Sequence, residues 1–153
     1  LECLKLLREY GAPWDERACD VSITRDVTYL QYLVENSCPY SDTLVSGAAR
    51  ANRIDHLKYL VSDCLLAVDD NVLFDALCFG SFECVQYLVD LGFSCTMPAK
   101  YLQYTHTFDD DKILTCLQYV AEHGWIFDSG FFFITRMHDL TACQEYLQAM
   151  YTV

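Results

Sequence analysis

A short helical segment recurs six times along this chain, and its spacing constrains the fold more than any other feature. The copies align on one aliphatic residue that follows a mostly aromatic column: Leu7, Leu33, Leu60, Leu88, Val120 and Leu147. The steps between successive copies are 26, 27, 28, 32 and 27 residues. A period of this length predicts a linear array of similar units, in which each unit packs mainly against its neighbours.

Each copy predicts an amphipathic helix. Leu30, Leu33 and Val34 recur at i, i+3 and i+4, which places them on one apolar face of a helix. Three copies carry glycine at the position where a left-handed residue commonly ends a helix: Gly11, Gly92 and Gly124. Ser37 and Cys64 occupy this column in two other copies, so we expect less sharply defined helix ends there.

A second helix is expected between each of these ends and the next copy. Residues that favour a helix start follow a short connection each time: Asp15-Glu16, Ser41-Asp42, Asp69-Asp70, Pro98 and Asp128-Ser129. Small residues on these helices let the paired helices approach closely: Ala18, Ala48, Ala49 and Ala76. The unit is therefore a helical hairpin of about 27 residues, which must stack on its neighbours to bury its apolar face.

The fold class predicted is all-α, a solenoid of stacked helix-turn-helix repeats that forms one domain over residues 1–153. The expected units are the second helix of a truncated repeat over 1–11 and repeats at about 12–37, 38–64, 65–92, 93–124 and 125–153. The step of 32 marks an insertion between 93 and 115. Because the chain opens on half a repeat, Leu4 and Leu7 lack a covering helix, and we expect further repeats before residue 1 or a docked second chain.

The chain resembles the short ankyrin-type repeats of large DNA viruses and some protists. The resemblance is carried by residues 3–7, by Gly-Ala-Pro-Trp-Asp at 11–15 and by a partial echo at 38–41. It covers essentially the whole chain and is weakest over 93–115. An ordinary ankyrin repeat has about 33 residues and a Thr-Pro-Leu-His tetrapeptide. This sequence has no such tetrapeptide and shorter units, so the hairpin between repeats should be reduced to a tight loop. The resemblance implies a protein-interaction scaffold.

The charge of the chain narrows the range of partners. Apolar residues make up 53% of the chain, charged residues 21%, and the formal net charge is −12. The basic residues are scattered singly, so this acidic surface disfavours nucleic acid. The longest apolar run, over 130–134, is far too short to span a membrane, and the first residues do not form a secretory signal. A protein partner with a basic surface is the expectation.

The cysteines predict packing and not cross-linking. There are nine, an odd number, and none is spaced Cys-x-x-Cys, which argues against a closed disulfide framework and against a zinc ribbon. Several fall on the apolar faces of the predicted helices, where cysteine serves as a small apolar filler. This pattern indicates a reducing compartment, the cytoplasm first and the nucleus as the alternative.

The sequence shows no convincing catalytic or cofactor-binding motif. His106 with the acidic run 109–111 is a candidate metal site, but a solvated acidic segment capping the next helix is the favoured interpretation. His56 falls in a packing column, and His123 precedes the helix end at Gly124, where a cation complements the helix dipole. Cys116 is two helical turns from His123, too far for a nucleophile pair. We therefore expect no enzyme and no cofactor; a Cys/His metal-dependent or redox enzyme is the least favoured alternative.

The tyrosines of the repeated helix resemble a stacking platform for bases, but their helical spacing next to leucine favours a half-buried core column. They are Tyr32, Tyr59, Tyr87, Tyr119 and Tyr146.

A partner should bind where the copies differ, along the edge formed by the connections and the starts of the first helices. Aromatic anchors in an acidic field would bind and steer a basic protein there. The predicted residues are Trp14, Asp15, Glu16, Tyr40, Asp42, Asp69, Asp70, Asn71, Met97, Tyr101, Phe127 and Asp128. The alternative role is that of a structural subunit docked through the incomplete N-terminal repeat.

Overall fold

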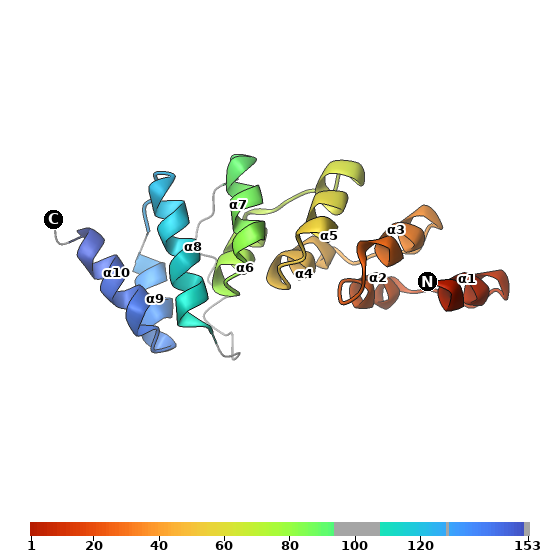
Figure 1. The fold of residues 1–153 in the computed structure, drawn as a ribbon, viewed down its shortest axis with the longest axis horizontal. Coiled ribbons are helices and arrows are strands. Elements are labelled where there is room, and N and C mark those ends of the chain that lie inside the picture. The colour runs from red at the N-terminus through yellow and green to blue at the C-terminus, as the bar shows by residue number, and fades with distance from the viewer. Residues whose placement is uncertain (94–107, 128, 152–153) are drawn as a thin grey trace.

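The chain forms an elongated stack of short helices (Figure 1). The computed structural model describes residues 1–93, 108–127 and 129–151. In this part of the chain all regular secondary structure is helical, and there is no strand. The expected all-α class is confirmed at this level. The expected start of the first helix at Pro98 lies outside the described residues.

The helices fall into two rows. One row contains α2 (Glu16–Ser22), α4 (Leu44–Arg50), α6 (Asp70–Cys78) and α9 (Ser129–Met137). The other contains α1 (Glu2–Glu9), α3 (Val27–Glu35), α5 (Ile54–Lys58) continued by the π-helix η1 (Tyr59–Asp63), α7 (Phe82–Asp90), α8 (Asp110–Glu122) and α10 (Thr141–Tyr151). Neighbours pack together from α2 to α6 in the first row and from α3 to α10 in the second, as do the paired helices α2 and α3, α4 and α5, α6 and α7, and α9 and α10. In the first row, α6 and α9 meet through the rings of Phe74 and Phe131. All six copies of the repeated segment therefore lie in helices of the second row.

The helix ends follow the glycine column closely. Gly11, Gly92 and Gly124 have φ of 74°, 83° and 84°. Ser37 also takes the left-handed conformation, with φ of 59°, and the Cys38 amide donates to the Leu33 carbonyl at 2.9 Å. The same hydrogen bond closes the glycine ends, for example from the Phe93 amide to the Leu88 carbonyl at 3.1 Å. The expectation of a less sharply defined helix end at Ser37 is therefore wrong.

The third copy ends differently because its last turn is π-helical over Tyr59–Asp63. The wider turn takes up one extra residue. Leu65, with φ of 54°, then occupies the left-handed position, whereas Cys64, with φ of −84°, does not. The expected end at Cys64 is shifted by one residue for this reason.

The helix starts confirm two of the predicted caps and correct a third. The Asp15 side chain accepts from the Arg17 amide, and the Asp69 side chain accepts from the Asn71 and Val72 amides. α4 instead begins at Leu44, after Thr43, which makes no side-chain cap. The expected start at Ser41-Asp42 is thus two residues early.

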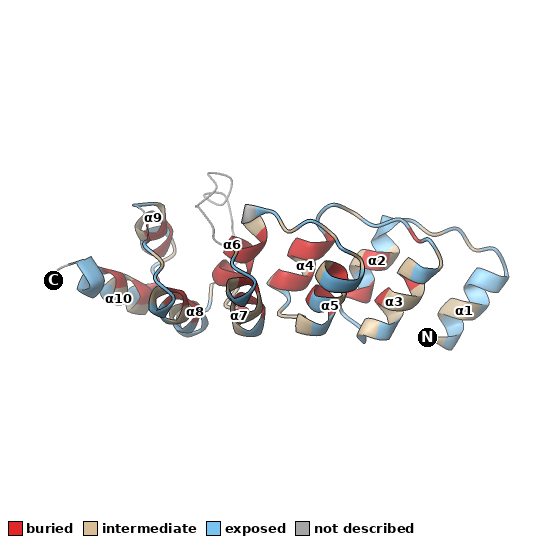
Figure 2. Ribbon diagram, turned by 90° about the horizontal axis from the view of Figure 1, so that it is seen from above, coloured by how far each residue is buried: buried red, intermediate tan, exposed pale blue. Residues whose placement is uncertain are grey.

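The core lies between the two rows, and the aligned column is central to it. Leu60, Leu88, Val120 and Leu147 are fully buried and Leu33 is 2% exposed. Figure 2 shows buried residues from α2 through to α10 and none in α1. The tyrosine column is half-buried in all five copies, as expected.

Neighbouring repeats are also joined by polar contacts. Arg50 of α4 forms an ion pair with Asp75 of α6 at 3.1 Å, and the Asp75 side chain is fully buried. Asp110, in the first turn of α8, accepts from the Ala142 and Cys143 amides at 2.8 and 3.1 Å. Asp110 therefore caps the start of α10 from the preceding repeat.

Candidate protein-binding groove

A groove lies between two successive connections of the array, the one that precedes α4 and the one that precedes α6. Its volume is about 270 Å³. It is lined by Tyr40, Ser41, Asp42, Val45, Ser46, Leu66, Ala67, Asp69 and Val72. We call this the connection groove. Three of the twelve residues predicted for partner binding, Tyr40, Asp42 and Asp69, line it together.

The sequence positions one wall of the connection groove through the end of α3. The left-handed Ser37 turns the chain sharply, and Tyr40 follows three residues later with 44% of its surface exposed. The Ser41 hydroxyl donates to the Asp20 carboxylate at 3.0 Å and lies 3.0 Å from the Thr43 hydroxyl. These contacts fix the connection that carries Tyr40 and Asp42 against α2.

The opposite wall is set by the start of α6. Asp69 accepts from the Asn71 and Val72 amides at 3.0 and 3.2 Å, and its second oxygen accepts from the Asn71 side-chain amide at 2.7 Å. The carboxylate is thereby held in one orientation at the rim of the groove. The floor is apolar, since Val45 of α4 and Val72 of α6 are 4% and 2% exposed.

The rim carries one sign of charge. Asp42 and Asp69 are both exposed carboxylates, and none of the described residues that line the groove is basic. An apolar floor below two carboxylates and an exposed tyrosine suits a ligand that presents an apolar side chain beside a cation.

The remaining predicted residues lie elsewhere or play other parts. Trp14 is half-buried, packs edge-on against Tyr32 at 6.1 Å, and has the Arg8 guanidinium 4.5 Å from its ring. Asp15 pairs with Arg17 at 2.6 Å, and the hydrogen bond from this guanidinium lowers the pKa of Asp15. Trp14 and Asp15 thus belong to the connection one repeat before the groove, and the exposed Glu16 begins α2 directly after it.

Phe127 is a correction to the predicted set. It is 3% exposed, and its ring packs edge-on against Phe131 at 5.2 Å. The sequence places Phe127 in a connection, but the helix that follows presents an apolar face that buries it. A partner cannot reach this side chain.

The last members of the set lie beside the groove or outside the described structure. The Asn71 side-chain amide donates to Asp69 at the rim of the groove, but Asn71 is not among the lining residues. The backbone of Asp70 begins α6, while its side chain lies outside the described part of the structure. Met97, Tyr101 and Asp128 also lie outside it.

The sequence reasoning missed the floor of the groove. Val45 and Val72 lie in the first turns of α4 and α6, but the repeat register aligns Val45 with Leu73, so the two valines do not share a column of the repeat. Leu66 and Ala67 lie just after the helix end, but the one-residue shift caused by the π-helical turn at Tyr59–Asp63 hid this from the alignment.

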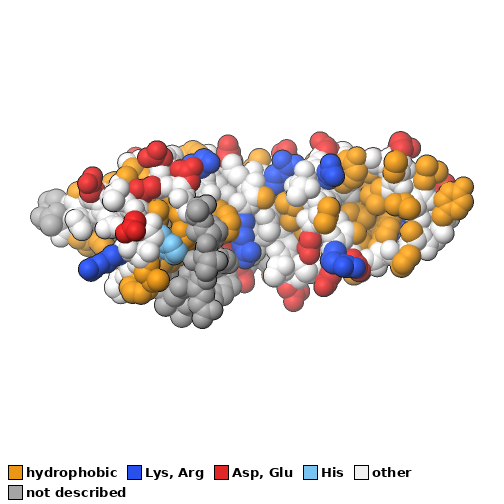
Figure 3. All heavy atoms as spheres, turned by 90° about the horizontal axis from the view of Figure 1, so that it is seen from below, with side chains coloured by type: hydrophobic (Ala, Val, Ile, Leu, Met, Phe, Trp, Pro, Cys, Tyr) orange, Lys and Arg blue, Asp and Glu red, His pale blue; other side chains and the backbone are white. Residues whose placement is uncertain are grey.

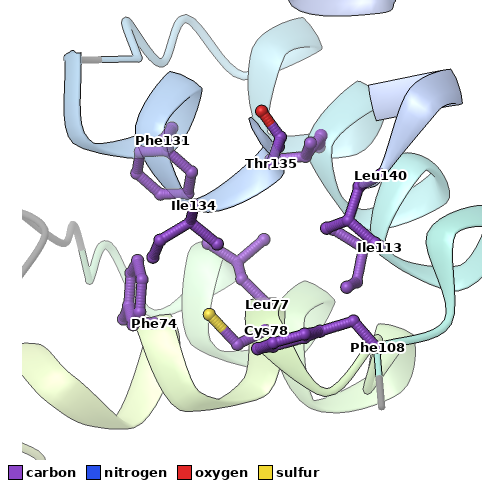
Figure 4. Close-up of a pocket in the computed structure, with 10 residues that line it drawn as sticks. Phe74, Leu77, Cys78, Phe108, Ile113, Phe131, Ile134, Thr135 and Leu140 are labelled. Carbon is purple, nitrogen blue, oxygen red and sulfur yellow. The ribbon is translucent and has the colours of Figure 1, made fainter. Parts of the chain in front are cut away.

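A second hollow, between α6, α8 and α9, is a packing void (Figure 4). Phe74, Phe131 and Ile134 point into it from α6 and α9, and Phe108 closes another side. Its volume is about 20 Å³, room for about one water molecule, and its described walls expose no polar surface. A cavity of this size and character does not hold a ligand.

The cysteine and histidine side chains that could react are either buried or in contact with a backbone carbonyl. Burial raises the pKa of the Cys84 and Cys116 thiols to about 12. His56 is 2% exposed, its Nε2 lies 3.3 Å from the Ser22 carbonyl, and burial lowers its pKa. His123 Nδ1 lies 2.8 Å from the Tyr119 carbonyl at the end of α8.

The acidic run before α8 has a structural role. Asp109 caps the helix through the Lys112 amide at 3.2 Å, and Asp110 and Asp111 form the first turn. His106 lies outside the described residues. Within residues 1–93, 108–127 and 129–151, no cluster of three or more His, Cys, Asp or Glu side chains could hold a metal ion.

No protein-family model, curated protein or solved structure matches this chain. Among the helices of the described part, none combines the length and apolar character needed to cross a membrane.

Proposed function

We propose that this chain is an ankyrin-like helical repeat array that binds a partner protein through the connection groove. The observation that carries the proposal is the convergence of Tyr40, Asp42 and Asp69 over an apolar floor between two successive repeats. Such a site needs two adjacent units to exist, which is how repeat arrays build their binding surfaces.

The physical basis for affinity is the pairing of Tyr40 with the floor. A tyrosine that is 44% exposed offers a large contact area, and its few rotatable bonds cost little entropy when it is fixed on binding. Val45 and Val72 lie at the bottom of the groove, so an inserted apolar side chain would be removed from water on several sides. We therefore propose an apolar anchor residue in the partner.

The physical basis for selectivity is charge. The groove carries Asp42 and Asp69 at its rim, on a chain whose net charge is −12. This field speeds the approach of a basic partner and repels acidic ones. The partner segment proposed is therefore an apolar residue flanked by lysine or arginine.

The proposal places the chain in a reducing compartment, with the cytoplasm as first choice. The support is that, in the part of the chain that the structure describes, Cys19, Cys38, Cys78, Cys84, Cys116 and Cys143 are buried in the packed core. They act as core residues, so the fold needs no oxidation.

Selection from a displayed library of random peptides tests the proposal. We expect enrichment of peptides with an apolar residue next to lysine or arginine, and a loss of affinity of at least about tenfold in Tyr40→Ala and Asp42→Lys. Association with Asp42→Lys should also depend less on salt, because one attracting charge has been reversed.

Two matched variants serve as controls. Tyr10→Ala removes a tyrosine that is 87% exposed, and Asp63→Lys reverses an exposed charge; neither residue lines the groove. Binding that falls equally in the controls, or peptides that bind Tyr40→Ala unchanged, would refute the groove as the binding site.

A further inference from the structure

Leu65 is an exposed hydrophobic residue in the middle of the array. Most large hydrophobic side chains that are exposed lie before residue 22 or after residue 125, and Figure 3 shows them gathered over the N-terminal end. Between these positions the described part of the chain has three, Tyr40, Leu65 and Leu91, of which Leu65 is the most exposed at 81%. It belongs neither to the hydrophobic core nor to the partly buried residues packed against it. Packing within the described array therefore does not explain a leucine at this position.

The backbone conformation of Leu65 is also unfavourable for leucine. Its φ of 54° lies in the left-handed region, where the Cβ atom of a side chain crowds the neighbouring carbonyl oxygen. The helix ends of four other copies place Gly11, Ser37, Gly92 and Gly124 in this conformation, so a large side chain stands here in the third copy and not in those four. The chain accepts a conformational cost at Leu65 that glycine would avoid, and such a cost is characteristic of functional positions.

The hydrogen bonds at this helix end place Leu65 beside the connection groove. In the preceding copy, the Cys38 amide donates to the Leu33 carbonyl, five residues earlier, at 2.9 Å. In the third copy the Leu66 amide donates to the Leu60 carbonyl, six residues earlier, at 3.0 Å, because the π-helical turn holds one extra residue. Leu66 lines the connection groove. The exposed Leu65 side chain therefore lies next to the wall of the groove that Leu66 forms.

We propose that Leu65 is a second apolar anchor for the partner of the connection groove, and this inference rests on the proposed function. The groove takes one apolar residue beside a cation, and Leu65 covers a second apolar residue of the same partner segment. The Cα atoms of Leu65 and Leu66 are about 4 Å apart, so the second contact lies close to the first. In an extended peptide, side chains two positions apart project on the same side, about 7 Å from each other. The partner is thus an extended segment with two apolar residues separated by one position, next to lysine or arginine.

Leu65→Gly separates a binding role from a structural one. Glycine adopts a φ of 54° without strain, so the melting midpoint should rise by about 1–3 °C. The affinity for peptides selected on the wild type should instead fall about tenfold, because the variant loses an apolar contact. Thermal unfolding and titration calorimetry of the same protein measure the two effects. A lower midpoint with unchanged affinity would show that Leu65 serves stability, and would overturn the proposal.

Ser37→Gly is the matched control. It makes the same backbone change at a φ of 59° in the preceding copy but removes no apolar side chain, so the midpoint should rise and the affinity should stay the same. Asparagine also tolerates the left-handed region, so Leu65→Asn should lose affinity as Leu65→Gly does, whereas Leu65→Met should keep most of it. Unchanged affinity in Leu65→Gly and Leu65→Asn, or an equal loss in Ser37→Gly, overturns the second anchor.

Tyr40→Ala, measured with the same peptides, separates this inference from the proposed function. A loss of affinity in Tyr40→Ala with none in Leu65→Gly leaves the groove standing and refutes the anchor. A loss in Leu65→Gly with none in Tyr40→Ala refutes the groove and supports Leu65 as a binding residue. A wild type that enriches no peptide refutes both.

Discussion

The repeated helix is exposed in its first copy, α1, and buried in the copies in the middle of the array. Leu7 and Leu60 occupy the same column, yet the first is 53% exposed and the second is fully buried. α1 is amphipathic like its later copies but has no buried residue, whereas α6 and α7 lie between neighbours on both sides. The comparison teaches that in this array a helix gains stability from adjacent repeats and little from its own sequence.

The largest difference in stability is expected between alanine variants of Leu60 and Leu7. Leu60→Ala should lower the free energy of unfolding by roughly 2–5 kcal/mol, because it leaves a cavity in a closed core. Leu7→Ala should change it by no more than about 0.5 kcal/mol, because the side chain is already half in water. Urea denaturation in dilute solution measures both, and equal losses would remove the distinction between the two regions.

The next largest difference in stability is expected between variants of two arginine–aspartate pairs. Arg50→Met should cost about 3 kcal/mol, because it leaves the fully buried Asp75 without this cation. Arg17→Met should cost at most about 0.5 kcal/mol, since Arg17 and Asp15 are both exposed. The same denaturation experiment applies. An Arg50 variant as stable as the Arg17 variant would show that the pair between α4 and α6 does not couple the repeats.

A smaller effect concerns the cap between α8 and α10. Burial tends to raise the pKa of Asp110, but hydrogen bonds from Cys143 and from the Ala142 and Cys143 amides outweigh it, so the pKa is lowered. A lowered pKa in the folded state adds stability above the ordinary aspartate pKa, and this stability is lost as the pH falls through the folded-state value. Asp110→Ala should therefore cost about 1 kcal/mol at neutral pH.

The stability difference between the wild type and Asp110→Ala should shrink as the pH falls below about 4, the range in which free aspartate is protonated. Denaturation series at several pH values measure it. A difference that stays constant down to strongly acidic pH would contradict the cap.

The smallest change in stability is expected at Ser37, which ends α3, the helix after α1 in its row. Its φ of 59° is costly for serine and not for glycine. Ser37→Gly should raise the free energy of unfolding by up to about 1 kcal/mol, whereas Gly92→Ala, at φ of 83°, should lower it by a similar amount. Melting midpoints that move in the same direction for both variants would exclude a left-handed helix end as the cause.

The sequence predicted the second-row helices well, because their signal is repeated six times. The spacing of Leu30, Leu33 and Val34 places them on one helix face, whatever conformation the connection takes. The helices pack through this face. The Tyr column was predicted for the same reason: helical spacing next to leucine leaves each ring half in the core.

The connections and individual surface positions were harder to predict. The π-helical turn at Tyr59–Asp63 shifts the helix end from Cys64 to Leu65, and nothing in the local sequence signals a wider turn. Phe127 resembled an exposed anchor, but it packs against Phe131 and is 3% exposed, so it is a core residue. The connection groove was predicted in part, since Tyr40, Asp42 and Asp69 vary between copies, but its floor depends on how two repeats stack.

Native-state hydrogen exchange in dilute solution tests most directly the claim that neighbours stabilise each helix. We expect the amides of α1, such as those of Leu7 and Arg8, to exchange through local opening at a small fraction of the unfolding free energy. The amides of α7, such as that of Leu88, should exchange only through opening of the whole central array. Protection of α1 as strong as that of α7 would contradict the account.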